Sequence, residues 1–344
     1  MESKPVFPLF VWILSGLLLV SSFYLPIHFD IPYPAPLGPR FDPQRKPEHL
    51  EYIQEHQPEI VLIGDSTLFL GVDQEQLTAE LGRETYSIAI PGSGSAVWYL
   101  LMKNTIAESA YTPRVVVILF HDTLLTLPAF RTTGLYFDIV DDYSRRNEPV
   151  LLERAYLDQM NPVEKAAQQY FPLFSARREM REGLDRRLRY SVPALLKCPQ
   201  NCVDEAINSV FGKQRLNPEA LSQAIDAAQQ SMYTPKVMDF DRQVDRSFLP
   251  EMIRIATENN IQLVFVRIKT LTYPTVATEP LALREYMAAL EGYVLRNHAL
   301  YMDFSHDERI KDEYFFDDLH LGAEGKEVFT HLLAEELRSL PDYP

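Results

Sequence analysis

The 344-residue chain contains only two cysteines, both in the segment Cys198-Pro-Gln-Asn-Cys202. A structural zinc site usually has four ligands, so this pair alone is too sparse to form one, and we expect no metal site. In an oxidising compartment the two thiols could close a small disulfide loop. Two free buried thiols are the alternative interpretation.

Basic residues are also scarce. The 33 Lys and Arg residues are outnumbered by 48 Asp and Glu residues, which gives a net charge of −15. A nucleic-acid-binding surface needs clustered Lys and Arg to contact phosphates, so the composition argues against a nucleic-acid partner. The 46% of hydrophobic residues suffice for a full core, in one large domain or two small ones.

Charged residues are absent from Val6 to Ile27. About 20 apolar residues can span a bilayer. A cleaved signal peptide would have a shorter apolar region and a small-x-small site, whereas residues 23–26 (Phe-Tyr-Leu-Pro) are typical of an interface anchor. We therefore expect residues 6–27 to be an uncleaved, single-pass signal anchor. Residues 1–5 would form a cytoplasmic tail at the cytoplasmic (inner) membrane, and the acidic bulk would lie on the extracytoplasmic, periplasmic side.

Six prolines follow between residues 32 and 47, and they predict a stiff, extended stalk over residues 28–58. The pattern then divides into a first α/β part (59–128), an insertion (129–245) and a second α/β part (246–344). The insertion has no strand pattern, and helices are expected at 150–169, 173–190 and 218–232.

Five apolar runs predict strands, and helical patterns separate them. The strands are expected at Ile60–Ile63, Tyr86–Ile90, Val115–Phe120, Gln262–Ile268 and Leu300–Phe304. The helices are expected at Val72–Leu81, Ala96–Ser109, Phe248–Glu258, Leu281–Leu295 and Glu324–Leu340. Strands that alternate with helices imply a parallel sheet covered on both faces. The fold class is therefore α/β, a three-layer sandwich with a five-stranded sheet of flavodoxin-like order.

The first strand ends abruptly in Gly64-Asp65-Ser66. Ligands of open α/β sheets bind at the carboxyl ends of the strands, so Ser66 would lie where chemistry usually occurs. A hydroxyl is a weak nucleophile and needs a base from elsewhere in the chain. Taken alone, the tripeptide favours an ordinary turn after an ordinary strand, because a short motif needs its context.

A suitable base occurs near the other end of the chain, in Asp317-Asp318-Leu319-His320. The spacing of Asp317 and His320 can let the carboxylate hold one imidazole nitrogen while the other nitrogen faces a serine. The order Ser…Asp…His is one of several known for such triads. Asp318 is the nearest rival to Asp317.

Together these motifs resemble those of the SGNH (GDSL-type) hydrolase superfamily. Gly64-Asp65-Ser66 matches its first block, Ile88-Ala89-Ile90-Pro91-Gly92-Ser93-Gly94 the second, and Asp317-x-x-His320 the last. The resemblance implies a flavodoxin-like fold with Ser66 as nucleophile, His320 as base and Asp317 as its orienting carboxylate. It also implies that the oxyanion is bound by the backbone N–H of Ser66 and by the glycine block, Gly92 and Gly94.

The third block departs from the family. The family has Gly-x-Asn-Asp after the third strand, and its Asn donates to the oxyanion, whereas this chain has Leu119-Phe120-His121-Asp122. A neutral imidazole can donate one N–H, so His121 can replace that Asn. The alternative is a histidine that only caps the strand end.

The anchored architecture resembles that of envelope polysaccharide O-acyltransferase accessory proteins. This resemblance implies an O-acyltransferase, with acetyl as the expected group, that acts on a cell-envelope polysaccharide or exopolysaccharide through a seryl acyl-enzyme. Its partners would be an acyl donor, a glycan acceptor and a membrane-bound O-acyltransferase, and no cofactor is implied. Two alternatives stay open: an anchored esterase or deacetylase, and a catalytically inactive SGNH fold that binds glycan or acts as a scaffold.

Overall fold

The structure is a computed structural model that describes residues 6–28, 38, 47–133, 136–145, 148–177, 180 and 230–340. The chain divides into two compact units, one of residues 1–38 with 156–227 and one of residues 39–155 with 228–344. Cys198 and Cys202 lie outside the described residues, as do most of the helices expected at 173–190 and 218–232.

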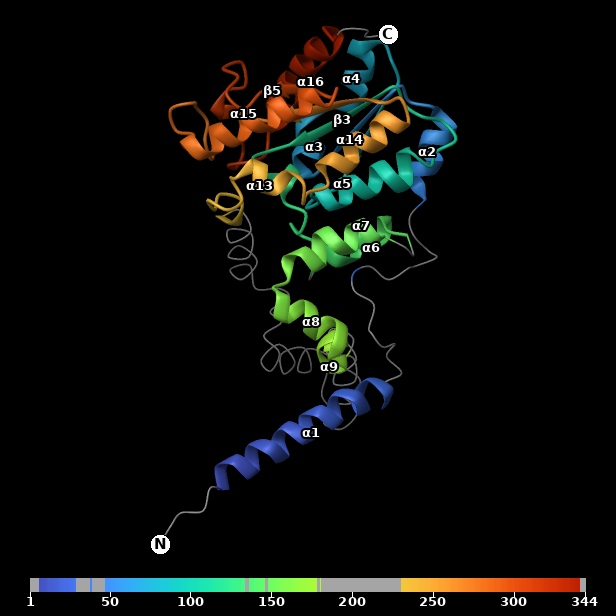
Figure 1. Cartoon of the computed structure of the whole chain (residues 1–344). Coiled ribbons are helices and arrows are strands. Elements are labelled where there is room, and N and C mark those ends of the chain that lie inside the picture. Colours follow the sequence, from blue (N-terminus) through green and yellow to red (C-terminus); the bar gives the residue numbers. More distant parts are fainter. Residues whose placement is uncertain are drawn as a thin grey trace, which may run out of the picture. The chain divides into compact units, whose positions relative to one another are not determined.

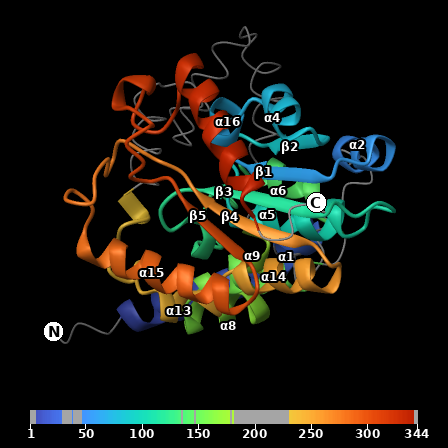
Figure 2. The ribbon, with the colours of Figure 1, turned by 90° about the horizontal axis from the view of Figure 1, so that it is seen from above.

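The larger unit contains a five-stranded parallel sheet in the order β2-β1-β3-β4-β5 (Figure 2). All five expected strands are present and the flavodoxin-like order is confirmed. The strands are β1 (Ile60–Gly64), β2 (Thr85–Ala89), β3 (Val115–Phe120), β4 (Gln262–Arg267) and β5 (Leu300–Asp303).

The register aligns the carboxyl ends of the three strands that carry the sequence motifs. Gly64 of β1 pairs with Ala89 of β2, and Ile63 pairs with Ile118 of β3. Every residue of β1 and β3 is buried, as expected for central strands of a parallel sheet with both faces covered. The segments after residues 64, 89 and 120 therefore leave the sheet at one edge.

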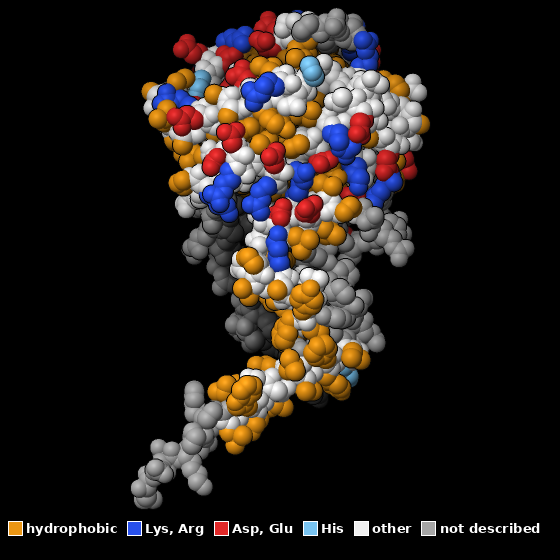
Figure 3. Space-filling model, in the orientation of Figure 1, with side chains coloured by type: hydrophobic (Ala, Val, Ile, Leu, Met, Phe, Trp, Pro, Cys, Tyr) orange, Lys and Arg blue, Asp and Glu red, His pale blue; other side chains and the backbone are white. Residues whose placement is uncertain are grey.

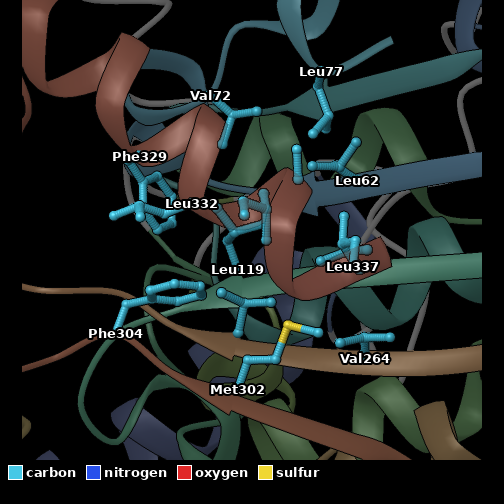
Figure 4. Packing of buried hydrophobic residues seen from close by; sticks show 14 of the residues in the cluster. Leu62, Val72, Leu77, Leu119, Val264, Met302, Phe304, Phe329, Leu332 and Leu337 are labelled. Carbon is cyan, nitrogen blue, oxygen red and sulfur yellow. The ribbon is translucent and has the colours of Figure 1, made fainter. Parts of the chain in front are cut away.

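One face of the sheet is covered by α3 (Ser66–Gly71), α4 (Gln74–Leu81) and α16 (Ala323–Arg338). Leu62, Leu119 and Val264 on the strands pack against Phe329 and Leu337 of α16 (Figure 4). Full burial of one such side chain contributes about 1.5–3 kcal/mol. The helix predicted before Gly82 is α4, and Gly82 ends it in the left-handed conformation, with φ +64°.

The other face is covered by α5 (Ser95–Leu101) and α14 (Leu249–Glu258), while α15 (Leu281–Arg296) contacts β5 (Figure 1). The α-helix expected over 96–109 is shorter than predicted, because α5 ends at Leu101 and the chain goes on as the π-helical turn η1 (Met102–Ile106). Short 3₁₀ turns η2 (Leu124–Thr126) and η6 (Asp312–Tyr314) complete the connections.

Part of the predicted stalk is helical rather than extended. Helix α2 (Glu48–His56) buries Ile53 completely, with 0% of that residue exposed. The prediction was wrong here because the prolines flank this segment, at Pro47 and Pro58, and none lies within it to interrupt the backbone hydrogen bonds.

The described part of the predicted insertion is helical, as expected, but its helices are short. The expected helix at 150–169 is broken, because Asn161 caps a new helix through a capping box and Pro162 occupies its first position. Residues 129–155 and 228–245 belong to the unit that contains the sheet. The elements are α6 (Phe137–Tyr143), α7 (Pro149–Leu151), η4 (Leu152–Tyr156), η5 (Leu157–Gln159), α8 (Pro162–Tyr170), α9 (Pro172–Ser175) and α13 (Phe240–Val244).

In the smaller unit, the 23-residue helix α1 (Val6–His28) contacts α9. Apolar side chains line α1 (Figure 3), and Leu9 and Trp12 are 62% and 76% exposed. Among the described residues, however, no helix has both the length and the apolar character that crossing a membrane requires. The membrane-spanning helix expected over residues 6–27 is therefore not found in the described part of the chain.

Candidate active site

Ser66 lies at the first position of α3, immediately beyond the carboxyl end of β1. Asp65 caps the helix, because its Oδ1 accepts hydrogen bonds from the Thr67 backbone N–H (2.8 Å) and the Thr67 hydroxyl (2.7 Å). A Cβ on Gly64 would lie only 2.7 Å from the Cβ of Leu68, so this tight connection requires glycine. The strand end and the helix cap together fix the backbone that carries the Ser66 hydroxyl.

A short, closed loop carries Asp317 and His320. Phe315 and Leu321 form an isolated antiparallel bridge across its base. The Gly322 N–H donates to the Tyr314 carbonyl oxygen at 2.7 Å, and the Phe316 N–H donates to that of His320 at 3.1 Å. These bonds hold the loop at the start of α16, next to α3.

Asp317 holds the ring of His320 in one orientation. Its Oδ1 accepts from the backbone N–H groups of Leu319 (2.8 Å) and His320 (2.7 Å). Its Oδ2 lies 2.8 Å from His320 Nδ1. Phe316 stacks on the imidazole at 5.7 Å between ring centroids. The carboxylate is thereby fixed by the backbone and can accept the Nδ1 proton.

The structure brings Ser66, His320 and Asp317 into one hydrogen-bonded chain. His320 Nε2 lies 2.8 Å from the Ser66 Oγ, although the residues are 254 positions apart. With the ring proton on Nδ1, Nε2 can accept the serine proton. Asp318 does not join this chain: it is exposed, and its backbone carbonyl oxygen accepts from the Leu271 N–H at 2.8 Å.

Asp317 is charged over a wider pH range than an ordinary aspartate. Partial burial acts to raise its pKa, but the hydrogen bonds from the His320 ring and from the Leu319 and His320 backbone N–H groups outweigh it. The net effect is a lowered pKa. The side chains of Asp317 and His320 are 46% and 20% exposed, so solvent reaches the site.

The glycine turn after β2 is fixed against the end of β1. The Ile90 N–H and the Ser93 hydroxyl both donate to the Gly64 carbonyl oxygen, at 2.9 and 3.3 Å. The Trp98 indole N–H in turn donates to the Ser93 Oγ at 3.0 Å. Gly92 has φ +79°, a conformation that favours glycine. The predicted oxyanion residues Gly92 and Gly94 thus lie at the same sheet edge as Ser66.

His121 is buried between two carboxylates at the end of β3. Its Nδ1 lies 3.0 Å from Asp122 Oδ2, and its Nε2 lies 3.9 Å from Asp65 Oδ2. Burial acts to lower the pKa of His121, but Asp122 and Asp65 raise it above the ordinary value. The imidazolium would donate one N–H to Asp122, while 3.9 Å is too long for a hydrogen bond to Asp65. The Nε2–H is then available to another acceptor.

Asp122 is itself fixed from a second direction. The Tyr233 hydroxyl donates to its Oδ2 at 2.7 Å. Burial acts to raise the pKa of Asp122, but the His121 and Tyr233 hydrogen bonds lower it, and burial beside Asp122 raises the pKa of Tyr233. Asp122 also adopts the left-handed conformation, with φ +47°, which is uncommon for a non-glycine residue. This network holds His121 in place beside Asp65, the cap of the Ser66 helix.

The groups assembled at this edge are suited to acyl transfer. They comprise a hydroxyl hydrogen-bonded to an imidazole, a carboxylate that orients the imidazole, and a fixed glycine turn. Within the described ranges, no three His, Cys, Asp or Glu side chains are placed to hold a metal ion.

Comparisons with known proteins give likeness at the level of solved structures only. No protein-family model matches the chain. No curated protein matches it either. A candidate acylhydrolase from Bacteroides fragilis is 11% identical, with a TM-score of 0.39 over 82% of this chain and 87% of its own. A GDSL-like lipase from Bacteroides thetaiotaomicron is also 11% identical, with a TM-score of 0.37 over 84% of this chain and 96% of its own. A candidate lipolytic protein of the G-D-S-L family from Desulfitobacterium hafniense is 10% identical, with a TM-score of 0.34 over 80% of this chain and 97% of its own.

The structure gives three residues at this edge roles that the sequence did not indicate. Asp65 is a helix cap, which the Asp-x-Thr spacing before an apolar turn could have indicated. Tyr233 comes from a segment more than 100 positions from Asp122, and no sequence signal marks it. Arg131 lies against Gly92 only because folding brings the two segments together, so no sequence signal marks Arg131 either.

Proposed function

We propose that this protein is an SGNH-type serine enzyme that takes acyl groups from esters through an acyl-enzyme on Ser66. The observation that carries the proposal is the hydrogen-bonded chain from the Ser66 Oγ through His320 to Asp317, with distances of 2.8 Å at both links. The block resemblance of the sequence and the parallel order 2-1-3-4-5 support it.

In the first half-reaction, the Ser66 Oγ attacks the ester carbonyl carbon while its proton passes to His320 Nε2. The carbonyl oxygen becomes an oxyanion, for which the Ser66 and Gly92 backbone N–H groups and the His121 Nε2–H are the proposed donors. The imidazolium then returns the proton to the leaving oxygen. The carbon–oxygen bond of the ester breaks, and the alcohol leaves an acyl group on Ser66.

In the second half-reaction, a hydroxyl compound attacks the acyl-enzyme and gives its proton to His320. Collapse of the intermediate releases the acyl product, and the proton returns to Ser66. If the attacking hydroxyl belongs to a sugar, the product is an acylated glycan. If it belongs to water, the product is a carboxylic acid.

We propose a cell-envelope or exopolysaccharide glycan as acceptor, acetyl as acyl group, and a membrane-bound O-acyltransferase as partner. The sequence supports this finer proposal in two ways. It resembles envelope O-acyltransferase accessory proteins, and its uncharged run of residues 6–27 is the proposed membrane anchor, with the bulk of the chain in the periplasm. Cell fractionation with and without residues 1–27 tests the anchor. Recovery of both forms in the same fraction would contradict it.

Hydrolysis is the second candidate, and one observation favours it. Because 46% of the Asp317 side chain and 20% of the His320 side chain are exposed, water can approach the catalytic groups. An esterase or deacetylase of glycan esters would use the same first half-reaction.

The full chain incubated with p-nitrophenyl acetate provides the test of the proposed function. We expect release of p-nitrophenol and an acetyl adduct on Ser66 by mass spectrometry, both lost in Ser66→Ala and both kept in Ser339→Ala, a substitution at an exposed serine of the C-terminal end. Turnover by Ser66→Ala at the wild-type rate would refute the proposal. Labelled acetyl groups recovered on added oligosaccharide rather than in acetate would then decide transfer against hydrolysis.

A further inference from the structure

The guanidinium of Arg131 lies beside the glycine turn of the site. Its Nη1 is 3.4 Å from the position that a Cβ on Gly92 would occupy. Its Cζ lies 4.9 Å from the ring centroids of both Phe130 and Tyr136. Arg131 therefore borders the turn that is proposed to bind the oxyanion.

Among the described residues, this cation has no ion-pair partner. Its Nε is buried without a hydrogen-bond partner, and the described part of the chain supplies no carboxylate in an ion pair with it. Two buried cations near the same sheet edge are paired: Arg267 with Glu279 and Asp303, and Lys269 with Asp312. Acidic residues outnumber basic ones by 48 to 33, so carboxylates are not scarce in this protein.

The buried Nε of Arg131 is costly to leave without an acceptor. A buried donor without a partner costs about 1–3 kcal/mol, and more when it is charged. Arginine offers five N–H donors in a planar fork that matches the oxygens of a carboxylate or a phosphate. A cost of this kind is met when a ligand supplies the missing acceptor.

The guanidinium is also held in position before any ligand arrives. The two aromatic rings, from residues on either side of Arg131, attract it through cation–π contacts. A Cβ on residue 92 would lie 2.7 Å from Tyr136 Cε1, so the missing side chain of Gly92 lets the Tyr136–Arg131 pair approach the turn closely. Donors fixed in this way lose little entropy when they bind.

We propose that Arg131 binds an anionic group, a carboxylate or a phosphate, on the glycan next to the reacting oxygen, so that the enzyme prefers acidic glycans, as acceptors in transfer or as esters in hydrolysis. The inference rests on the proposed function and names the substrate class for the same site. Nearby charges agree with it, because the two carboxylates closest to the site, Asp65 and Asp122, lie against His121 rather than against Arg131. In a protein of net charge −15, anions are repelled at long range, so this local cation is needed to select them.

The test compares three O-acetylated substrates that differ in one group: methyl galactoside, methyl galacturonoside and methyl galactoside 6-phosphate. For the full chain, kcat/KM is measured on each with wild type, Arg131→Gln, Arg131→Lys and the control Arg254→Gln, an exposed arginine of α14 that pairs with Glu251 and Glu258. We expect wild type to prefer one acidic ester over the neutral ester by about tenfold or more, as for hydrogen bonds to charged groups. Arg131→Gln should bring this ratio close to one, Arg131→Lys should keep part of it, and the control should keep it all.

The acidic ester that wild type prefers more strongly over the neutral ester identifies the anion as carboxylate or phosphate. No preference in wild type, or an undiminished preference in Arg131→Gln, overturns the proposal. Equal losses on acidic and neutral esters in Arg131→Gln also overturn it, because Arg131 would then act on the oxyanion or on folding. If no sugar ester is turned over, p-nitrophenyl acetate still decides the proposed function, and calorimetric titration with galacturonate and galactose oligosaccharides decides this inference. Binding of only the acidic oligosaccharide, lost in Arg131→Gln, supports it, and any other result refutes it.

Discussion

Replacement of Asp317 by Asn tests the proton path through the site. In the structure, Asp317 Oδ1 accepts from two backbone N–H groups, those of Leu319 at 2.8 Å and His320 at 2.7 Å. An asparagine must keep its single carbonyl oxygen at that position to satisfy the same donors. Its NH₂ group then takes the position of Oδ2, which lies 2.8 Å from His320 Nδ1.

This orientation reverses the hydrogen bond to the imidazole. The NH₂ group donates, so Nδ1 must accept and the ring proton moves to Nε2. Nε2 lies 2.8 Å from the Ser66 Oγ, and once protonated it can no longer take the serine proton. The variant keeps the shape of the site but holds its base in the wrong tautomer.

The same change in a serine-protease triad lowers kcat about 10⁴-fold. Because 46% of the Asp317 side chain is exposed, water screens its charge more than it screens that of a buried carboxylate. We therefore expect a smaller loss, about 10²- to 10³-fold, or about 3–4 kcal/mol of barrier.

Initial rates with p-nitrophenyl acetate measure the effect, and melting temperatures establish that the variant folds. Asp318→Asn is the matched control, because its side chain is exposed and makes no described contact with His320. We expect this control to keep close to the wild-type rate. Equal losses in the two variants, or a fully active Asp317→Asn, would refute the reasoning.

Two further predictions concern the supports of the site. A Cβ at Gly325 would lie 2.8 Å from Leu321 Cδ2 and from Tyr314 Cβ, so Gly325→Ala should shift the loop that carries Asp317 and His320. We expect kcat/KM to fall about tenfold or more and the free energy of unfolding to fall by about 1–3 kcal/mol. A Cβ at Gly71 would have its nearest neighbour at 3.7 Å, so Gly71→Ala should keep close to the wild-type kcat/KM and free energy of unfolding. Losses in Gly71→Ala as large as those in Gly325→Ala would contradict this prediction. His121 has a raised pKa in the folded protein, so its stabilising effect is complete below about pH 6.5 and is lost as the pH rises through the folded value, by at most about 1.4 kcal/mol per pH unit. Denaturant titrations from pH 6 to 9 should show this slope in wild type and not in His121→Gln; the same slope in both would exclude His121 as its source.

The five strands and most helices of the sheet unit could be predicted because their signals are local. A buried parallel strand such as Val115–Phe120 is a continuous apolar run, and Gly82 ends its helix through a left-handed backbone that glycine favours. Prediction failed where a local pattern had two outcomes. The prolines around residues 48–56 predict an extended stalk, but the buried Ile53 shows that tertiary packing selects a helix.

The sequence alone indicated the five strands, and it marked Ser66 and His320 as candidate site residues with Asp317 and Asp318 as candidate partners, since each is marked by its neighbours in the chain. Only the tertiary structure decided between Asp317 and Asp318, because both carboxylates are close to His320 in sequence and only one faces its ring. It also decided the surroundings of His121, and it brought Arg131 to Gly92. Contacts of this kind depend on where separate segments leave the sheet, and no local pattern of residue types specifies that.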